Sequence, residues 1–374
     1  MSLDTTRPAP AAARVPAAAR LPSFPWDALV PYREKASGHP GSVVDLSMGT
    51  PVDPTPAVVR DALAAAADAP GYPLTAGSPE LRKVLADWVG HRCGAAGIGV
   101  DGVLPTIGTK EVVAWLPTLL GLGPGDVVVY PRLAYPTYEI GARLAGATPV
   151  AADSLTSLGP SRVRLIWLNS PSNPTGRVLP PAHLRKVVDW ARERGAVLAS
   201  DECYLELGFD SAAVSALSVC DGDYRGVLSV HSLSKRSNLA GYRAGFVAGD
   251  PALVAELLEV RRHGGMIVPA PVQAAMVAAL SDPTHVEAQR QRYAVRREQL
   301  RAALQTAGFA IEHSEAGLYL WATRGEDCWQ TVEWFADRGI LVAPGSFYGT
   351  DGVLHVRVAL TATDERVAAA VSRL

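Results

Sequence analysis

Residues 103–146 read VLPTIGTKEVVAWLPTLLGLGPGDVVVYPRLAYPTYEIGARLAG and contain the same pattern twice. In each half a short apolar run, 103–107 or 126–131, precedes a segment with the apolar spacing of a helix, 109–120 or 136–146. Strands that are apolar on both faces are typical of parallel sheets covered by helices. The stretch therefore predicts two strand–helix units of an α/β fold.

The pattern continues toward the C-terminus. RLIWLNS at 164–170 precedes a helical segment at 180–195, and further apolar runs follow at 196–202 and 226–232. Repeated units of this kind predict an α/β domain that binds its ligands at the carboxyl ends of the strands. Upstream of the opening stretch, helices are expected at 56–69 and 78–92.

A different pattern begins near residue 270. A long charged helix is expected at 283–308, followed by short apolar runs and a second helix near 329–339. This mixture predicts a second, smaller α+β domain. The expected parts of the chain are a disordered tail (1–20), an N-terminal arm that packs with the small domain (21–44), a large domain (45–270) and a small domain (271–374).

Composition argues against several classes of protein. The net charge is -2 and there is no long basic run, so we expect no nucleic-acid partner. No apolar stretch is long enough for a membrane span, and the first twenty residues lack the apolar core of a secretory signal. The four cysteines form no CxxC pair and no metal-like spacing, so we expect a reduced, cytoplasmic protein without a metal site.

Polar residues follow four of the predicted strands. Gly108 opens a helix after the first strand, and Asn173, Asp201 and Lys235 come after three later strands. Taken singly, each has an ordinary explanation as a helix cap, a loop hydrogen bonder or a solvated charge. Together, on one rim of a sheet, they indicate a binding site.

The residues around Lys235 indicate the kind of ligand. The helix start at Gly108-Thr109 offers free N–H groups to an anion, and Ser232, Ser234 and Arg243 add hydroxyls and a fixed positive charge. The sequence has no GxxxxGK[ST] motif, so it has no P-loop, and no GxGxxG motif follows a first strand, which argues against a nicotinamide-dependent enzyme. A phosphate site beside a lysine and a strand-end aspartate suggests pyridoxal 5'-phosphate, whose aldehyde needs an amine and whose ring nitrogen needs a carboxylate.

Eight stretches carry a resemblance to a known family. They are GYPLTAGSPELR, IGTKEVV, RLAYPTYE, NSPSNPTG, SDECYLE, SLSKRSNLAGYRAGF, APGSFYG and HVRVAL, in this order along the chain. The chain resembles the class I/II aminotransferases of fold type I over nearly its whole length. The resemblance implies an α/β PLP-transferase fold: a large domain with a mostly parallel seven-stranded sheet, and a smaller α+β domain.

The resemblance also implies a role for each matching residue. Lys235 is similar to the Schiff-base lysine that moves the substrate proton, and Asp201 to the partner of the pyridine nitrogen. Asn173 and Tyr204 match the pair that hydrogen-bonds the cofactor 3'-oxygen and lowers the imine pKa. Tyr135 matches the aromatic ring that stacks on the pyridine. The positions that match the phosphate cup are Gly108, Thr109, Lys110, Ser232 and Arg243.

Substrate and subunit contacts follow from the same resemblance. Arg357 matches the arginine that binds the substrate α-carboxylate, with Gly49 and Asn173 beside it. Tyr72 matches a tyrosine that reaches the phosphate of the neighbouring subunit, so a homodimer with shared sites is implied. Ordinary explanations remain open: Tyr72 and Tyr135 as packing aromatics, and Arg357 as an exposed strand arginine. We interpret Cys203 as a packing residue.

A closer similarity is to the bacterial N-succinyldiaminopimelate aminotransferases of lysine biosynthesis. It is carried by LSMGTPVDPTP, SDECYLELG and VRVALTATDERV among other stretches. It implies glutamate as donor and N-succinyl-2-amino-6-oxopimelate as acceptor. Val268 departs from the pattern, because many relatives have a small hydroxyl residue there that helps the partner's phosphate site.

Other functions stay open from the sequence. They are an aminotransferase of a specialised pathway, a PLP-dependent C–S lyase or cyclase on the same scaffold, and a non-catalytic PLP-fold binding protein. The residues that contact the distal end of the substrate are not evident, and solvated surface charge is the favoured explanation for each candidate. The candidates by neighbourhood are Lys35, Arg132, Arg261, Arg262 and His263.

Overall fold

The structure, a computed structural model, describes residues 16–159 and 162–374. Residues 1–15 of the expected disordered tail lie outside this part. Ala17–Arg20, at the end of the tail, form a 3-10 helix (η1), and the disorder of the tail stays a prediction. A run of alanines favours helical backbone. No helix in the described residues is both long enough and apolar enough to span a bilayer.

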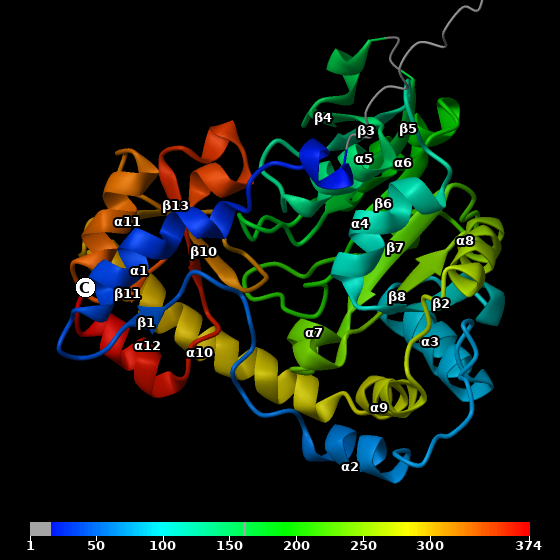
Figure 1. The fold of residues 1–374 in the computed structure, drawn as a ribbon, viewed down its shortest axis with the longest axis horizontal. Helices are drawn as coiled ribbons and strands as arrows, with labels where there is room; N and C mark the ends of the chain where they lie inside the picture. Colours follow the sequence, from blue (N-terminus) through cyan, green and yellow to red (C-terminus); the bar gives the residue numbers. More distant parts are fainter. Residues whose placement is uncertain (1–15, 160–161) are drawn as a thin grey trace, which may run out of the picture.

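A seven-stranded, mostly parallel sheet forms the centre of the larger part, and this confirms the predicted fold class (Figure 1). Its order is β2-β8-β7-β6-β5-β3-β4, and only β8 runs antiparallel to its neighbours. The strands are β2 (Val103–Ile107), β3 (Val127–Tyr130), β4 (Thr148–Ala151), β5 (Val163–Asn169), β6 (Val197–Asp201), β7 (Val227–Ser232) and β8 (Ala244–Gly249).

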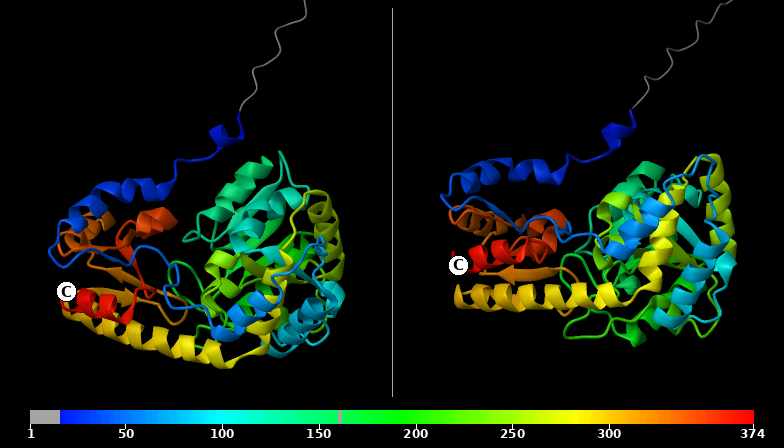
Figure 2. Two further views of the ribbon diagram at one scale, coloured as in Figure 1. Left: turned by 60° about the horizontal axis from the view of Figure 1, so that its bottom comes forward. Right: turned by 90° about the horizontal axis from the view of Figure 1, so that it is seen from below.

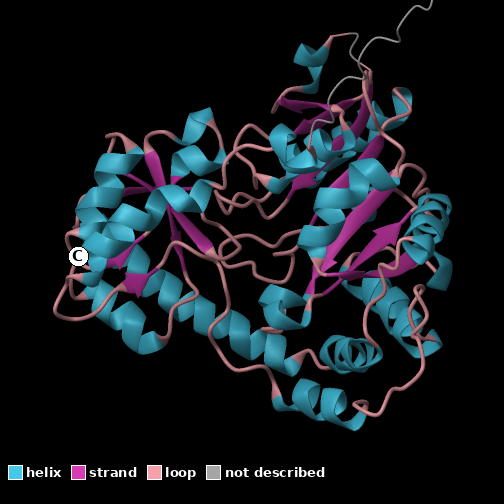
Figure 3. Cartoon of the chain, viewed as in Figure 1, coloured by secondary structure: helices cyan, strands magenta, loops and turns pink. Residues whose placement is uncertain are grey.

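Helices cover both faces of this sheet, as the apolar strands require (Figures 1 and 3). One apolar core lies between the sheet and α3, α6 and α9, and a second lies between the other face and α4, α5 and α8. The helices of this part are α2 (Ala57–Ala65), α3 (Pro79–Arg92), α4 (Thr109–Leu119), α5 (Thr137–Ala145), α6 (Pro181–Glu193), α7 (Leu233–Arg236), α8 (Pro251–His263) and α9 (Ala270–Ser281).

The smaller part is built around a four-stranded antiparallel sheet of order β12-β13-β10-β9. Its own apolar core includes residues of α10, α11 and α12. The remaining strands and helices are β1 (Val44–Asp45), β9 (Ala310–Glu312), β10 (Tyr319–Thr323), β11 (Ile340–Leu341), β12 (Ala343–Pro344), β13 (His355–Ala359), α1 (Val30–Ser37), α10 (Thr284–Thr306), α11 (Cys328–Ala336) and α12 (Asp364–Val371).

The N-terminal arm and the helices α9 and α10 show how the chain divides between the two parts. The N-terminal arm packs on the smaller part, where α1 contacts α11 and β1 pairs with β11. Figure 2 shows α10 as one long helix that runs from the larger part beneath the smaller one. Helix α9 packs on α2 and α3, on the side of the large sheet. We therefore propose that the domain boundary lies between α9 and α10, after the expected position at residue 270.

The sheet register places polar residues next to one another at one edge. Asn169 at the end of β5 lies opposite Asp201 at the end of β6, and Ser232 ends β7 beside them. Strands β10 and β13 of the smaller part bring Tyr319 and Arg357 to the same region. The carboxyl ends of the parallel strands thus face the smaller part, which is the usual place for a ligand in such folds.

Candidate active site

A cavity of about 930 Å³ lies between this edge of the sheet and the smaller part. That volume is in the range of small-molecule and cofactor sites. It brings together eleven of the thirteen site residues predicted from the sequence. They are Gly49, Thr109, Lys110, Tyr135, Asn173, Asp201, Tyr204, Ser232, Lys235, Arg243 and Arg357.

An anion-binding corner is built around the start of α4. Gly108 precedes the helix with a φ of 71°, and no side chain caps the helix N–H groups. A Cβ at Gly108 would overlap the guanidinium of Arg243, so only glycine lets that charge approach the backbone. Ser232, whose Oγ accepts from the Ser234 N–H at 3.1 Å, lines the same cavity. The corner offers N–H groups, hydroxyls and one guanidinium, which fits a phosphate.

Asp201 occupies the centre of the cavity wall. Its carboxylate accepts hydrogen bonds from Tyr138 Oη at 2.8 Å and from the Cys203 N–H at 3.2 Å. Burial raises its pKa, because the charged form is desolvated and these bonds only partly compensate. A cationic ring N–H placed here would offset that penalty. The carboxyl group therefore fits the partner of a protonated pyridine nitrogen.

Lys235 projects into the cavity from α7. Its Nζ donates a hydrogen bond to the carbonyl oxygen of Gly49. Burial lowers the pKa of the amine, and the nearby charges of Arg357 and Arg243 lower it further. A lysine with a lowered pKa is more readily neutral, which an amine needs in order to attack a carbonyl carbon.

Arg357 is fully buried on the opposite side of the cavity. Its guanidinium donates to Asn173 Oδ1 at 2.8 Å and to the Ser47 carbonyl at 2.7 Å. It lies 3.9 Å from the centre of the Tyr319 ring and 4.7 Å from that of Tyr348. Its Nε has no hydrogen-bond partner among the described residues. A buried guanidinium with a free donor and no carboxylate of its own is suited to a carboxylate from the substrate.

Two tyrosines stand between Lys235 and Arg357. Tyr204 Oη and Tyr319 Oη lie 3.1 Å apart, and both side chains line the cavity. Asn173, which matches the same cofactor oxygen as Tyr204, accepts from Arg357 through Oδ1, so its Nδ2 remains a donor. Tyr135 packs edge-on against Tyr138 with ring centres 6.0 Å apart, and burial raises its pKa to about 12.

Two of the predicted residues do not line this cavity. Gly108 lies just behind its wall, where it supports Arg243. Tyr72 is 100% exposed on the loop between α2 and α3. A tyrosine that serves the neighbouring subunit would be exposed in a single chain, so its position is in keeping with the expected role without testing it.

Val268 and the candidates for the distal substrate end lie elsewhere. Val268 is 1% exposed and packs in the core between the sheet and α9, so its side chain reshapes no cavity wall within one chain. The charged candidates are all paired with acidic side chains: Lys35 with Glu333 and Asp337, Arg132 with Asp351, Arg261 with Glu111, and Arg262 and His263 with Glu259. None of the five lines the cavity.

The mouth of the cavity is formed by segments that the sequence did not single out. The segment 21–26, which leads into a 3-10 helix at Pro25–Leu29, contributes Phe24 and Trp26. Trp26 packs against Phe347 with ring centres 5.3 Å apart. Lys110, the second residue of α4, also lines the cavity, and no described residue forms an ion pair or hydrogen bond with its ammonium group. The lining thus includes an aromatic wall and one lysine without a side-chain partner.

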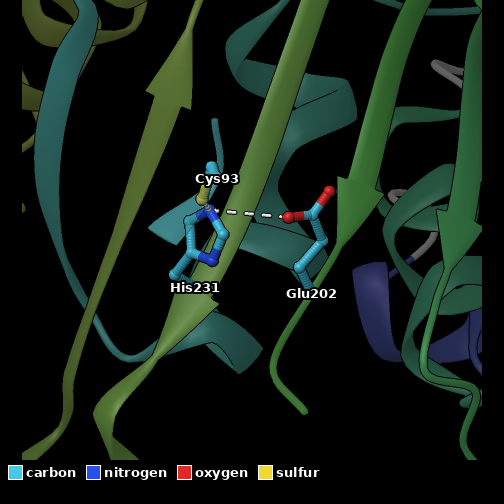
Figure 4. A group of neighbouring side chains, drawn as sticks. All are labelled: Cys93, Glu202 and His231. Atoms are coloured by element: carbon cyan, nitrogen blue, oxygen red, sulfur yellow. Dashed lines mark hydrogen bonds and ion pairs between the residues drawn. The ribbon is translucent and has the colours of Figure 1, made fainter. Parts of the chain in front are cut away.

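A buried polar cluster lies where the end of α3, the end of β6 and β7 meet (Figure 4). His231 Nε2 is 3.8 Å from Cys93 Sγ and 3.8 Å from Glu202 Oε2. These atom types can bind a metal ion. However, His231 Nε2 is hydrogen-bonded to Ser229 Oγ at 2.8 Å, and the pKa of Cys93 is raised by burial. We interpret the cluster as a neutral, structural one.

Some contacts that shape the site could be found only from the structure. Tyr138 lies in the first turn of α5, but Tyr135 precedes the helix, so helical spacing does not relate the two side chains. Tyr319 had no local signal. It reaches the site because β10 pairs with β13, the strand that carries Arg357.

Comparison with known proteins agrees with this geometry. The model of a protein family described as aminotransferase class I and II matches residues 41–374. The chain is 61% identical over 356 residues to the 4-dedimethylamino-4-oxo-anhydrotetracycline transaminase OxyQ of Streptomyces rimosus, covering 95% of this chain and 99% of that protein. It is 63% identical over 366 residues to Probable aminotransferase Rv1178 of Mycobacterium tuberculosis, covering 97% and 88%.

A solved structure gives the same result. The structure of a probable N-succinyldiaminopimelate aminotransferase from Thermus thermophilus superposes with a TM-score of 0.84 at 28% identity. The match covers 94% of this chain and all of that chain.

Proposed function

The chain belongs to the class I and II aminotransferases, and from this premise we propose that it transfers the amino group of glutamate to N-succinyl-2-amino-6-oxopimelate. The reaction class follows from the family: a pyridoxal 5'-phosphate-dependent transfer between an amino acid and a 2-oxo acid. The pair of substrates is our proposal.

The chain's own residues divide the chemistry among them. The bound cofactor supplies an aldehyde that takes up the amino group and a ring that accepts electron density. Lys235 Nζ would take the proton from the substrate α-carbon and deliver it to C4' of the cofactor. Asp201 holds a proton on the ring nitrogen, and Arg357 binds the α-carboxylate. Tyr204 and Asn173 Nδ2 donate toward the cofactor's ring oxygen.

Lys110 is the observation that supports the acidic substrates. In a ping-pong reaction donor and acceptor occupy the same cavity in turn, so one distal cation can bind both. Glutamate and the N-succinyl acceptor each carry a carboxylate beyond the reacting carbon. Lys110, in the first turn of α4, lines the cavity without a side-chain partner among the described residues. We assign its ammonium group to this second carboxylate, since Arg357 and Arg243 are assigned to the α-carboxylate and the phosphate. The name of the Thermus thermophilus structure supports the same acceptor.

A second candidate acceptor is a polycyclic ketone of the kind named for the Streptomyces rimosus relative. Phe24, Trp26 and Phe347 favour it, because aromatic side chains at the mouth would pack on flat apolar rings. This would make the chain an aminotransferase of a specialised pathway.

A donor and acceptor screen with the cofactor-loaded protein separates these candidates. Glutamate is incubated with each acceptor and 2-oxoglutarate is measured; the N-succinyl acceptor should give the highest kcat/KM. Lys110→Gln should lower kcat/KM for glutamate roughly tenfold or more, the value of one charged hydrogen bond. It should leave kcat/KM unchanged for alanine, an amino donor whose side chain carries no charge. Faster turnover of the polycyclic ketone would replace the proposed acceptor. A sulfur-containing amino acid such as cysteine is offered separately, and its conversion to pyruvate, ammonia and free sulfide would indicate a C–S lyase instead.

We further propose a homodimer in which Tyr72 completes the partner's phosphate corner. Large apolar side chains are exposed along residues 48–74: Met48, Val52, Val58, Tyr72 and Leu74. Exposed apolar surface of this kind is typical of interfaces with a second chain. The four cysteines are unpaired, which is in keeping with the proposed cytoplasmic location.

A further inference from the structure

The hydroxyl groups of Tyr319 and Tyr204 form a hydrogen bond in which either one could be the donor. Tyr204 can donate to the cofactor only if Tyr319 is the donor in this bond. Tyr204 Oη and Tyr319 Oη are 3.1 Å apart, and among the described residues each is the other's only hydrogen-bond partner. Each hydroxyl has a single proton to donate. If Tyr204 donates to Tyr319, its proton points away from the cavity. If Tyr319 donates to Tyr204, the Tyr204 proton is free for a ligand in the cavity.

The surroundings of Tyr319 favour the second arrangement. The guanidinium of Arg357 lies 3.9 Å from its ring centre. Burial by itself would raise the pKa of Tyr319, but the positive charge of Arg357 and, in the absence of cofactor, the smaller effect of Lys235 bring it below its ordinary value. Burial raises the pKa of Tyr204 well above its ordinary value. The more acidic hydroxyl is the better hydrogen-bond donor. Tyr319 therefore donates its proton to Tyr204 in this pair.

The backbone is shaped to hold Tyr319 in this position. A Cβ at Gly49 would overlap the Tyr319 hydroxyl, so the absence of a side chain there is what admits it. The carbonyl of the same glycine accepts from Lys235 Nζ. One short segment therefore sets the positions of both the lysine and the tyrosine pair.

We propose that Tyr319 is a positioning residue, which donates its hydroxyl proton to Tyr204 Oη and thereby directs the Tyr204 O–H toward the 3'-oxygen of the bound cofactor. The proposal rests on the proposed function, in which Tyr204 serves that oxygen. Hydrogen bonds in a chain polarise one another, so donation by Tyr319 also strengthens donation by Tyr204. The titratable and charged groups that face the pair are Lys235, Arg357, Cys203, Tyr135 and Tyr348.

Tyr319→Phe tests the proposal, because it removes the hydroxyl and keeps the ring beneath Arg357. The measurement is the absorbance of the bound cofactor as a function of pH. Donation from Tyr204 lowers the pH midpoint of that change, so Tyr319→Phe should raise it by about half to one pH unit, the value of one neutral hydrogen bond. The kcat should fall several-fold, and KM for the amino donor should stay the same because Arg357 keeps its contacts.

Tyr348→Phe is the matched control. Tyr348 is also buried, and Arg357 lies 4.7 Å from its ring, but its hydroxyl has no hydrogen-bond partner among the described residues. Removing that hydroxyl should leave the midpoint unchanged. If Tyr319→Phe and Tyr348→Phe give the same midpoint as the parent enzyme, the proposal is wrong.

The double variant Tyr204→Phe/Tyr319→Phe checks the order of the chain. If Tyr319 acts through Tyr204, the double variant shifts the midpoint no further than Tyr204→Phe alone. Additive shifts would show that Tyr319 acts independently and would overturn the proposal. A parent enzyme that binds the cofactor without the absorbance change, or that transfers no amino group, would instead contradict the proposed function.

Discussion

At the scale of single residues, the site depends on groups whose protonation burial has altered. The pKa of Lys235 is lowered, chiefly by burial, and its amine points at the Gly49 carbonyl from the wall of the cavity. The imine between Lys235 and the cofactor should absorb at roughly 400–430 nm. Lys235→Ala should therefore abolish this absorbance. Transamination should fall by several orders of magnitude, measured as 2-oxoglutarate formed from glutamate.

Lys186→Ala is the control for that change. Lys186 is exposed on α6, and removing its charge should leave both absorbance and rate unaltered. Retained activity in Lys235→Ala would show that another group moves the proton.

A second residue-scale prediction concerns stability and the buried pair of Glu202 and His231. Burial raises the pKa of Glu202 to about 7 and lowers that of His231 to about 3. Between about pH 4.5 and 6.5 the folded protein holds one proton, on Glu202, and the unfolded chain also holds one, on the histidine. Equal proton counts give no slope, so this pair leaves stability independent of pH in that window.

Glu202→Gln should remove this balance. The unfolded chain then takes up a proton on residue 231 that the folded protein refuses, so the free energy of unfolding should fall by about 1 kcal/mol for each pH unit from 6.5 down to 4.5. Denaturant unfolding at several pH values measures it. Glu259→Gln, beside the exposed His263, should produce no such slope. The charges that face the pair from neighbouring elements are Arg92, Arg236 and Asp201.

The sequence identified the residues of the site whose chemistry is distinctive and missed those placed by tertiary structure. Lys235, Asp201 and Asn173 follow strands, so the topology alone brings them to one edge. Tyr319 and Trp26 look like ordinary core aromatics in the sequence. Only the pairing of β10 with β13 and the path of the N-terminal segment bring them to the cavity.

At the scale of elements, α4 is flanked by two glycines that both have positive φ but have different surroundings. Gly108 has a φ of 71° and Gly121 a φ of 69°. A Cβ at Gly108 would overlap the Arg243 guanidinium, whereas a Cβ at Gly121 would meet nothing within 4 Å. The pair therefore separates backbone strain from loss of the anion site.

Gly108→Ala and Gly121→Ala should each destabilise the protein by about 1 kcal/mol, because alanine disfavours positive φ. Only Gly108→Ala should weaken cofactor binding, by roughly tenfold or more, since Arg243 must move away from the phosphate corner. Fluorescence titration of the cofactor-free variants with pyridoxal 5'-phosphate measures both affinities. Equal affinities would mean that Arg243 does not bind the phosphate.

Strands are predictable from the sequence only where their side chains carry a pattern. The five apolar strands of the centre were expected, whereas β4 and β8 were not. Strand β4 (TPVA) lies at the edge of the sheet with its ends exposed, so it has no continuous apolar run. Strand β8 (AGFVAG) is buried throughout, but small residues replace the branched ones that mark a strand.

At the scale of the whole molecule, the proposed dimer predicts that two defective subunits can restore each other. A subunit with Lys235→Ala lacks the amine but still supplies Tyr72, and one with Tyr72→Ala does the reverse. Equal mixing and reassembly should give about a quarter of the parent activity, since half of the dimers are mixed and each has one intact site. Mixing without reassembly is the control, and a mixture no more active than its components would contradict shared sites.

The boundary that we propose between the two parts, after α9, has no clear signal in the sequence. The helical pattern of 270–281 gives no indication of which part it packs on, because α9 is apolar on most sides. Its contacts with α2 and α3 decide this, and those contacts join segments about 200 residues apart in the sequence.

Helix α10 is a stiff beam between the parts. Its 23 residues extend about 34 Å without interruption. Near one end His285 Nε2 lies 2.8 Å from Ser237 Oγ, two residues beyond Lys235, and near the middle Arg296 is bonded to Asp53 and Asp364. A tilt of about 5° at one end displaces the other by roughly 3 Å over this length. A rotation of the smaller part, which carries Arg357, would therefore be transmitted through α10 to the segment that carries Lys235.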